Sequence, residues 1–409
     1  MPDVLDPAAT AWVLASTAMV LLMTPALALF YGGMVRTTGV LNMMMMSLIC
    51  IPLVTLVWIL FGYSLVFTEG FAGIIGGAEL IGLDLDVNEV HGTVPALLFV
   101  TFQLTFAIIT AALVSGAIAD RARFAAWVAF VPVWLLVVYV PIAHWVWGPG
   151  GWIAEWGVLD YAGGLVVEIT SGASALALAL VLGTRHGFKV ESMRPHNLPF
   201  VLTGAGLLWF GWFGFNSGSA LAADGKAAAV LLNTLVAGGM GMLGWLAVER
   251  IRDGHPTSFG AASGVVAGLV AITPACGVVS TWGALVVGLA AGVVCSWAIG
   301  LKHKFNYDDS LDVVGVHFTG GIVGTLLIGL LAAETMTGGP EGLLMGGGPA
   351  LLGKQAVAIV AVASYAFVVS YVLGTVVNKV VGFRLAPQAE HEGIDFAEHG
   401  ETAYVEPLR

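Results

Sequence analysis

The sequence predicts an all-α membrane protein, and three observations carry that prediction. Hydrophobic residues make up 58% of the 409-residue chain and charged residues only 10%, whereas soluble domains carry about 25% charged residues. The mean hydropathy is +0.93. The 55 glycines fall largely inside the apolar runs, where small residues let helices approach closely in lipid. The net charge of −11 gives no sign of a nucleic-acid partner.

Eleven apolar segments are long enough to cross a bilayer, which takes about 20 residues of helix. The first has no basic start and no small-residue cleavage site, so we expect it to be retained rather than removed as a signal peptide. The predicted spans are 12–34, 41–67, 95–119, 124–147, 162–183, 198–221, 227–249, 258–277, 282–301, 311–333 and 356–378.

The basic residues predict the orientation of these spans, because cytoplasmic loops are enriched in Lys and Arg. Lys226 and Lys354 are the only two basic residues in the loops after even-numbered spans. The other 13 follow odd-numbered spans: Arg36, Arg121, Arg123, Arg185, Lys189, Arg194, Arg250, Arg252, Lys302, Lys304, Lys379, Arg384 and Arg409. We therefore expect the N-terminus outside and the C-terminus in the cytoplasm.

The chain divides into a transmembrane domain, 1–383, and a polar, acidic tail, 384–409. The tail cannot form another span. It is read either as a disordered end or as a cytoplasmic docking and regulatory element.

An internal repeat places ionisable residues inside two spans. The stretch D-Y-A-G-G-L-V-V-E-I-T-S-G at 160–172 aligns with D-S-L-D-V-V-G-V-H-F-T-G-G at 309–321. In each, an aspartate (Asp160, Asp309) precedes an ionisable residue (Glu168, His317) by eight positions, and x-T-x-G follows. The two stretches fall in spans of opposite predicted orientation. Spans 1–5 and 6–10 would then form an inverted repeat, which places substrate sites near the bilayer midplane.

The depth of these residues follows from helix geometry. Each aspartate would cap its helix, and eight residues of helix carry the ionisable residue about 12 Å inward. In a hydrocarbon core of about 30 Å, Glu168 and His317 would reach depths only about 6 Å apart, so their side chains could meet. Two interpretations of the pair stay open. It has a function, as polar residues inside spans usually do, or it is a structural contact that joins the two half-repeats.

Aromatic residues gather near the same axis in F-Q-L-T-F at 102–106, H-W-V-W at 144–147 and W-F-G-W-F-G-F-N-S-G-S at 209–219. Such residues can form an interfacial belt. Aromatic faces also attract a cation, a reading open to Phe106, Trp147, Trp212 and Phe215, with Ser219 supplying a hydroxyl.

With these features the sequence resembles the ammonium transporter (Amt/Mep/Rh) family, and its bacterial Amt branch, over nearly the whole chain. The matching motifs are A-L-F-Y-G-G-M-V-R (28–36), F-Q-L-T-F-A (102–107), P-I-A-H-W-V-W-G (141–148), L-D-Y-A-G-G (159–164), G-W-F-G-F-N-S-G-S-A (211–220), D-D-S-L-D-V-V-G-V-H (308–317), E-G-I-D (392–395) and H-G-E-T-A-Y (399–404).

The resemblance implies a homotrimer with one pore per subunit. It implies recruitment of ammonium or methylammonium at Phe106, Trp147 and Ser219, and a gate formed by Phe106 and Phe215. It also implies that Asp160 shapes the outer vestibule. Asp309 and Trp212 are expected to have structural roles near the site.

The pore below the gate would be narrow and lined by two histidines, the second at His317. This chain departs from the family at the first, where Glu168 replaces histidine, as in some fungal members. Transport is still expected, with neutral ammonia conducted and the proton carried by the Glu168–His317 pair. The pair could be a fixed ion pair or a neutral pair, which the sequence leaves open.

The tail resembles the Amt segment that assists regulation by the PII signalling protein at the cytoplasmic face. The residues that match this segment are Glu392, Gly393, Ile394 and Asp395. The sequence therefore predicts a multi-pass transporter of the plasma (cytoplasmic, inner) membrane that serves nitrogen utilisation and contacts membrane lipid. It predicts no cofactor and no metal site, because one Glu and one His leave a metal incompletely coordinated.

Two other functions compete with transport. One is an ammonium sensor that signals through a partner protein, because the short tail is too small for a folded signalling domain. The other is an intramembrane enzyme, against which the absence of H-E-x-x-H and G-x-S-x-G motifs argues.

Overall fold

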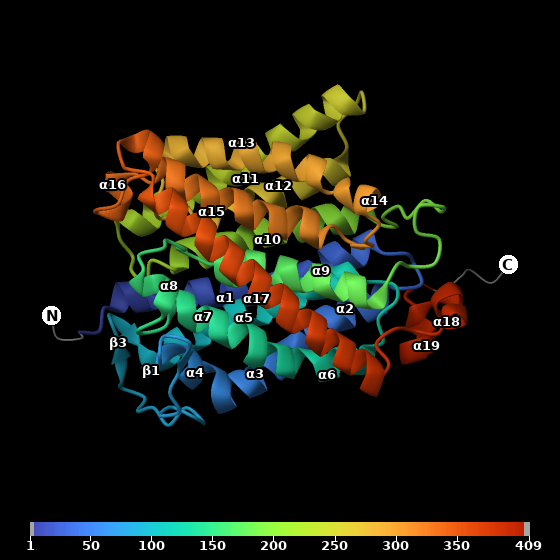
Figure 1. Ribbon diagram of the computed structural model, residues 1–409, viewed down its shortest axis with the longest axis horizontal. Coiled ribbons are helices and arrows are strands. Elements are labelled where there is room, and N and C mark those ends of the chain that lie inside the picture. Colours follow the sequence, from blue (N-terminus) through green and yellow to red (C-terminus); the bar gives the residue numbers. More distant parts are fainter. Residues whose placement is uncertain (1–3, 405–409) are drawn as a thin grey trace.

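The computed structural model describes residues 4–404. Arg409, which was counted for the predicted orientation, and the end of the tail at 405–409 lie outside the described residues. Long helices run side by side along the long axis of the molecule, with short connections at both ends (Figure 1). This arrangement is an all-helical bundle, as the composition predicts.

Ten helical segments in the described chain are long and apolar enough to cross a membrane. Several of them contain short π or 3-10 stretches. They are α1 (Pro7–Met34), α2 to α4 (Val40–Phe67), α5 with η2 (Ala96–Ile118), α6 to α8 (Phe124–Glu155), η4 with α9 (Gly164–Leu182), α10 (Leu198–Gly218), α11 (Gly225–Arg252), α13 with α14 (Thr281–Phe305), η5 with α15 (Val314–Leu331) and α17 (Ala350–Val380).

The remaining predicted span, 258–277, forms the shorter helix α12 (Ser258–Ile272). Pro274 explains why the helix ends early, because a proline lacks the N–H that the next helical hydrogen bond needs. Turns then continue the chain, with Cys276 N–H donating to the Ile272 carbonyl and Val279 N–H to the Ala275 carbonyl. The described chain therefore has ten helices of spanning length, and the eleventh predicted span holds a shorter apolar helix.

Short strands and single helical turns lie in the loops that connect the long helices. The loop after α4 carries two antiparallel hairpins, β1 (Gly70–Phe71) with β2 (Ile75–Gly76) and β3 (Val90–His91) with β4 (Val94–Pro95). Two further turns of helix, α16 (Glu334–Thr337) and η6 (Leu343–Met345), precede α17. In Figure 1 the hairpins lie at the end of the bundle where α1 begins.

The tail is ordered against the body over its described part. It forms α18 (Pro387–Glu392) and α19 (Ile394–His399). The Asp395 carboxylate accepts the backbone N–H groups of Leu41 and Asn42 at 3.0 and 2.8 Å, which caps the start of α2. Glu398 does the same for α6 by accepting the N–H of Phe124 at 2.8 Å. These contacts disagree with the reading of the tail as a disordered end up to residue 404.

Candidate pore site

Two helices with matching irregular starts cross at the centre of the bundle. The π-helical turns η4 (Gly164–Ile169) and η5 (Val314–Phe318) hold Glu168 and His317. The Thr170 hydroxyl donates to the Leu165 carbonyl, five residues back. The equivalent Thr319 hydroxyl donates to the Val314 carbonyl, with the same spacing. In each x-T-x-G motif the threonine hydroxyl therefore adds a second hydrogen bond to a carbonyl that already accepts the backbone N–H of the same threonine across the π turn. Such turns are frequent at functional sites.

The two aspartates of the repeat hold the starts of these helices. The Asp160 carboxylate accepts four backbone N–H groups, those of residues 163 to 166, at 2.6 to 3.3 Å. Asp309 accepts the N–H groups of Val313 and Val314 at 3.0 and 2.7 Å. Both aspartates thus lie at helix starts, as the spacing in the sequence predicts.

The final glycine of each motif lies where the helices cross. A Cβ on Gly172 would lie 2.5 Å from the backbone nitrogen of Phe318. A Cβ on Gly321 would lie 2.9 Å from the Cβ of Glu168. Any larger residue would push the helices apart, so the glycines permit the close approach that brings Glu168 to His317.

Glu168 and His317 are in direct contact. Glu168 Oε2 lies 2.7 Å from His317 Nδ1, with the side chains only 1% and 5% exposed. The second carboxyl oxygen, Oε1, is buried and has no hydrogen-bond partner in the described protein. A buried polar atom without a partner is costly, so this oxygen marks a place where a polar guest would be stabilised.

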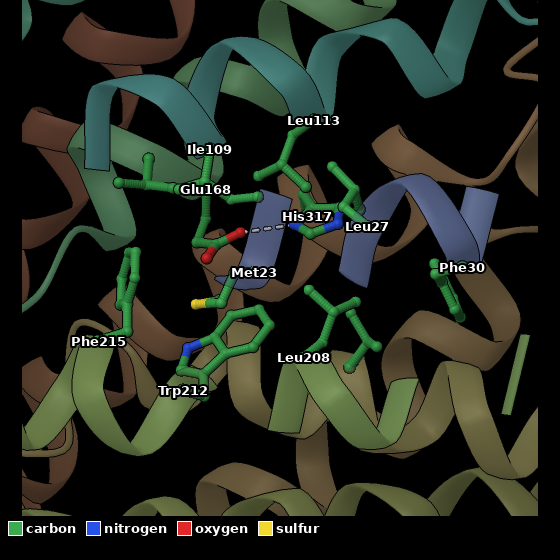
Figure 2. Close-up of a pocket in the computed structure, with 12 residues that line it drawn as sticks. Met23, Leu27, Phe30, Ile109, Leu113, Glu168, Leu208, Trp212, Phe215 and His317 are labelled. Carbon is green, nitrogen blue, oxygen red and sulfur yellow. Dashed lines mark hydrogen bonds and ion pairs between the residues drawn. The ribbon is translucent and has the colours of Figure 1, made fainter. Parts of the chain in front are cut away.

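The contact lies in a narrow, apolar space. Its free volume is about 10 Å³, close to that of one water-sized molecule. The lining is otherwise aliphatic, aromatic or thioether: Met23, Leu27, Phe30, Ile109, Leu113, Val167, Leu208, Trp212, Phe215 and Val266. Figure 2 shows the carboxyl of Glu168 between the Phe215 ring and the His317 imidazole. Trp212 is held by a hydrogen bond from its indole N–H to the Thr273 hydroxyl at 2.8 Å.

A pair of stacked rings closes one end of this space. The Phe106 and Phe215 centroids are 4.0 Å apart with an interplanar angle of 25°. Both rings are buried, at 2% and 1% exposure. Phe215 lines the narrow space and Phe106 lines the cavity beyond it, so the stacked pair lies between the two.

Beyond the rings lies a cavity of about 370 Å³, called the Trp147 cavity, which is lined by Trp147, Phe106, Ser219, Tyr161 and seven further residues. The Trp147 ring meets Phe106 edge-on at 6.0 Å, and its N–H donates to the Asp160 carbonyl at 3.1 Å. The Ser219 hydroxyl donates to the Phe215 carbonyl at 2.8 Å. Its lone pairs are therefore left to accept from a guest. The structure thus brings together the three residues expected to recruit ammonium.

On the other side of His317 a second narrow space of about 10 Å³ is lined by Tyr31, Ser263, Asp312 and apolar residues. Asp312 also lines a wide cavity of about 430 Å³, called the Arg185 cavity. Lys302 donates to the Asp312 carboxylate at 2.6 Å. The two narrow spaces share Phe30, Val266 and His317, and the second shares Met34, Leu311 and Asp312 with the Arg185 cavity. The Trp147 cavity adjoins the first narrow space through the stacked rings, because Phe106 lines the cavity and Phe215 lines the narrow space. The four spaces therefore form one file from Trp147 to Arg185.

A buried cluster of charged residues stabilises the end of the file at Arg185. Arg185 donates to both Asp308 oxygens at 2.9 Å and lies 3.4 Å from Asp120. Arg121 donates to the Asp308 carbonyl at 2.6 Å. Burial by itself would raise the pKa of Asp308, but the hydrogen bonds and charge of Arg185 outweigh it and hold that pKa below its usual value.

Sequence reasoning missed several residues of this file. Tyr161, Ser263 and Asp312 line it. Tyr161 and Ser263 are uncharged, and Asp312 is only the second residue of the predicted span 311–333. None of them therefore gave the signal that singled out Glu168 and His317, an ionisable residue deep inside a span. Thr273, which holds Trp212, follows a helix end that periodicity does not mark. The aspartate repeated within D-S-L-D at 309–312 was the one available hint of Asp312.

A bundle of membrane-length helices enclosing a file of narrow apolar spaces defines a multi-pass membrane protein with a pore-like passage. The sequence matches the Ammonium Transporter Family over residues 11–404. The chain belongs to this ammonium transporter family, which consists of plasma-membrane transporters and channels and not of enzymes. The resemblance drawn from the motifs is confirmed.

Relatives share this match along their length. An ammonium transporter of Mycobacterium tuberculosis is 49% identical over 98% of this chain and 90% of the relative. One of Bacillus subtilis is 46% identical over 95% of this chain and 96% of the relative. The crystal structure of Candida albicans Mep2 superposes with a TM-score of 0.89 at 33% identity, covering 99% of this chain and 94% of that chain. A structure titled "Sensor Amt Protein" gives a TM-score of 0.88 at 28% identity, covering 96% and 98%.

Proposed function

We propose that the chain transports ammonium by recruiting the ion at the Trp147 cavity, removing its proton and conducting neutral ammonia through the narrow apolar space. The observation that carries the proposal is the buried Glu168–His317 contact, 2.7 Å long, in a space that fits one small molecule. A bare ammonium ion would pay a large desolvation cost there, whereas ammonia would not.

Recruitment rests on Phe106, Trp147 and Ser219. The rings of Trp147 and Phe106 offer negative π faces to a cation, and Ser219 offers a hydroxyl oxygen. Phe106 and Phe215 act as the gate that separates the hydrated cavity from the dry space. Asp160 does not touch the ion, because its carboxylate is used by four backbone N–H groups. Its role is to hold Trp147 and the start of η4 in place.

The proton follows a separate route through Glu168 and His317. The free oxygen of Glu168 can take a proton from the side of the gate, while its partner oxygen already contacts His317. Because two groups in contact titrate as a pair, the proton belongs to both and can be released from the imidazole. The pair thereby replaces the two histidines expected from the family.

Proteoliposomes containing the purified chain test this function. Rapid addition of ammonium should produce a transient current, and radiolabelled methylammonium should accumulate inside the vesicles. Empty liposomes and a Trp147→Ala variant are the controls. A current and an uptake equal to those of empty liposomes would contradict the proposal.

We further propose eleven crossings, with the N-terminus outside and the C-terminus in the cytoplasm. Support comes from α12, which is buried among α10, α11, α13 and α15 and is continued to Val279 by hydrogen-bonded turns. Irregular backbone is tolerated at membrane depth when protein surrounds it. In Figure 1 the start of α1 and the tail helices lie at opposite ends, as an odd number of crossings requires. Single cysteines at Glu79 and Asp253 should react with an impermeant reagent from opposite sides.

The chain is also proposed to act as a homotrimer in the inner membrane, with residues 1–383 forming the transmembrane domain and 384–409 a regulatory tail. The docking of α19 through Asp395 supports the tail's role, because it ties the E-G-I-D segment to the start of α2. Native mass spectrometry tests the trimer. Deleting residues 388–409 should weaken capture of a PII protein, and capture that is unchanged by the deletion would count against the tail.

A sensor remains the second function, favoured by the similarity to the structure titled "Sensor Amt Protein". Uptake separates the two functions. Cells expressing the chain should accumulate methylammonium if it transports, whereas a sensor would support an ammonium response with little accumulation.

A further inference from the structure

Lys226 is a positively charged residue among loops that are mostly acidic. Apart from Asp160, whose carboxylate accepts four backbone N–H groups, the loops proposed to face outward hold ten acidic residues in the described chain: Asp6, Glu69, Glu79, Asp84, Asp86, Glu89, Glu155, Asp224, Glu334 and Glu341. Lys226 and Lys354 are their two basic counterparts, so the net charge of this side is −8 (2 − 10). Lys226 also lies in the first turn of α11 (Gly225–Arg252), where the helix dipole disfavours a positive charge.

The Lys226 ammonium group is nonetheless held at one spot. Its Nζ lies over the Tyr161 ring, 5.4 Å from the centroid. Among residues 4–404 it makes no ion pair or hydrogen bond. The contact is therefore a cation–π interaction between a primary alkylammonium and an aromatic face.

Tyr161 is a fixed part of the Trp147 cavity. Its ring lines that cavity together with Phe106, Trp147 and Ser219. Its N–H donates to the Pro274 carbonyl at 3.1 Å. The ring packs so closely on Gly277 that a Cβ there would lie 2.2 Å from Tyr161 Cδ2. A ring held on one side by backbone and open to the cavity is a preformed surface for a cation.

We propose that Tyr161 is a second, peripheral cation-binding subsite of the Trp147 cavity, and that the Lys226 ammonium occupies it as a tethered competitor. This inference rests on the proposed function, in which ammonium or methylammonium arrives at that cavity. The lysine head group and methylammonium are chemically alike, each a primary ammonium on carbon. An arriving cation displaces Lys226 from the ring and then moves on to Trp147 and Phe106, so Lys226 sets the apparent affinity for substrate.

Replacing Lys226 with methionine tests the competitor, because methionine keeps an unbranched side chain and removes the charge. The concentration of ammonium that gives half-maximal current should fall about two- to five-fold, the strength of one exposed cation–π contact. Lys354→Met is the matched control, since it removes the same charge from the same side. The control should change the half-maximal concentration less than Lys226→Met does.

Tyr161→Leu decides whether the ring is the subsite. In a protein that already carries Tyr161→Leu, Lys226→Met should lower the half-maximal ammonium concentration no more than Lys354→Met does. Two results would overturn the subsite: an equal fall in the half-maximal concentration for the two lysine variants, or a fall for Lys226→Met that persists in full with Tyr161→Leu. Either result would mean that Lys226 acts only through the general electrostatic field of the surface.

A readout independent of transport comes from the reactivity of the lysine amine. Tetramethylammonium binds aromatic faces and does not react with acylating esters, so it should displace Lys226 and raise its acylation rate, measured by mass spectrometry, while Lys354 stays unchanged. Equal rates with and without tetramethylammonium would overturn the subsite. Absence of ammonium-dependent current in the unaltered chain would instead contradict the proposed transport, and the acylation result would still decide the subsite.

Discussion

At the scale of one residue, Glu168 is a polar side chain placed where its burial costs stability. Its carboxyl is 1% exposed, with one oxygen on His317 and the other unpartnered in the described protein. An aliphatic residue would fill the space without the cost of burying a polar group. The proposed transfer of a proton through Glu168 accounts for a carboxyl at this position, which packing alone does not.

Glu168→Gln should reduce ammonium-dependent current at least ten-fold while leaving recruitment at the Trp147 cavity nearly unchanged. The amide has almost the same shape and can still contact His317, but it cannot accept and release a proton. Current on proteoliposomes measures the first effect, and the half-maximal ammonium concentration measures the second. Glu155→Gln, an exposed change, is the control, and undiminished current in Glu168→Gln would contradict the relay.

Glu168→His should retain transport with an altered pH dependence. A histidine restores the pair expected from the family, and its ordinary pKa of about 6.5 lies well above that of a carboxyl. The current measured from pH 5 to pH 8 should therefore change its profile relative to the unaltered chain. An inactive but folded variant would indicate that the surrounding space is shaped for a carboxylate.

The sequence anticipated this contact because an ionisable residue in an apolar run is conspicuous and because helix rise is constant. It did not reveal Tyr161, Ser263 or Lys226. Aromatic residues, hydroxyl groups and loop lysines are common in membrane proteins, and only the tertiary structure shows which of them reach the same cavity.

At the scale of elements, the crossing of η4–α9 and η5–α15 depends on two glycines. Gly172→Ala should lower stability by about 1–3 kcal/mol through overpacking, because its Cβ would lie 2.5 Å from Phe318. Thermal unfolding in detergent measures the loss, and current should fall as the Glu168–His317 contact loosens.

Gly206→Ala is the matched control for this substitution. A Cβ at Gly206, in α10, would meet nothing within 4 Å, and alanine favours helix over glycine by up to about 1 kcal/mol. Its melting temperature should stay unchanged or rise. Equal destabilisation of the two variants would mean that the crossing is not the cause.

The positions of the helices were predicted well because hydropathy reports burial in lipid directly. The observed helix boundaries differ from the predicted ones at two kinds of place. A helix ends early at a proline, as at Pro274, or continues beyond its apolar run into polar residues, as in α11 and α17. The tail helices α18 and α19 escaped prediction because six-residue helices are not stable alone. Helix α19 is held by its contacts with α2 and α6. Helix α18 is held through Glu390, which accepts hydrogen bonds from Arg384 and from the His186 N–H. No local pattern encodes these contacts.

At the scale of the whole molecule, the Arg185–Asp308 pair joins the end of α9 to the loop before η5, and so ties the two pore helices together at one end of the bundle. Asp308→Asn should destabilise the protein by about 3 kcal/mol, the lower end of the cost of breaking a buried ion pair, because Arg185 keeps its 3.4 Å contact with Asp120. The exposed pair Arg252–Asp253 supplies the control, and Asp253→Asn should leave the melting temperature unchanged.

The same variant has a defined pH dependence. Because Arg185 holds the pKa of Asp308 below its ordinary value, the stabilisation is complete above the unfolded pKa of about 4. It is lost as pH falls through the lower, folded pKa. The difference in melting temperature between Asp308→Asn and the unaltered chain should therefore be constant from pH 5 to pH 7 and shrink below pH 4. A difference that grows below pH 4 would contradict this assignment.

The unequal charge of the two sides has a consequence for ions in general. A surface with a net charge of −8 gathers every small cation from the medium, sodium and potassium included. Its reach is limited by the Debye length, about 8 Å in physiological salt and about 30 Å at 0.01 M. Dilute fresh medium would thus enrich all monovalent cations at the mouth of the protein, and saline medium would not. Discrimination among them must begin where the hydration shell is first removed, at the rings of the cavity and not at the acidic surface.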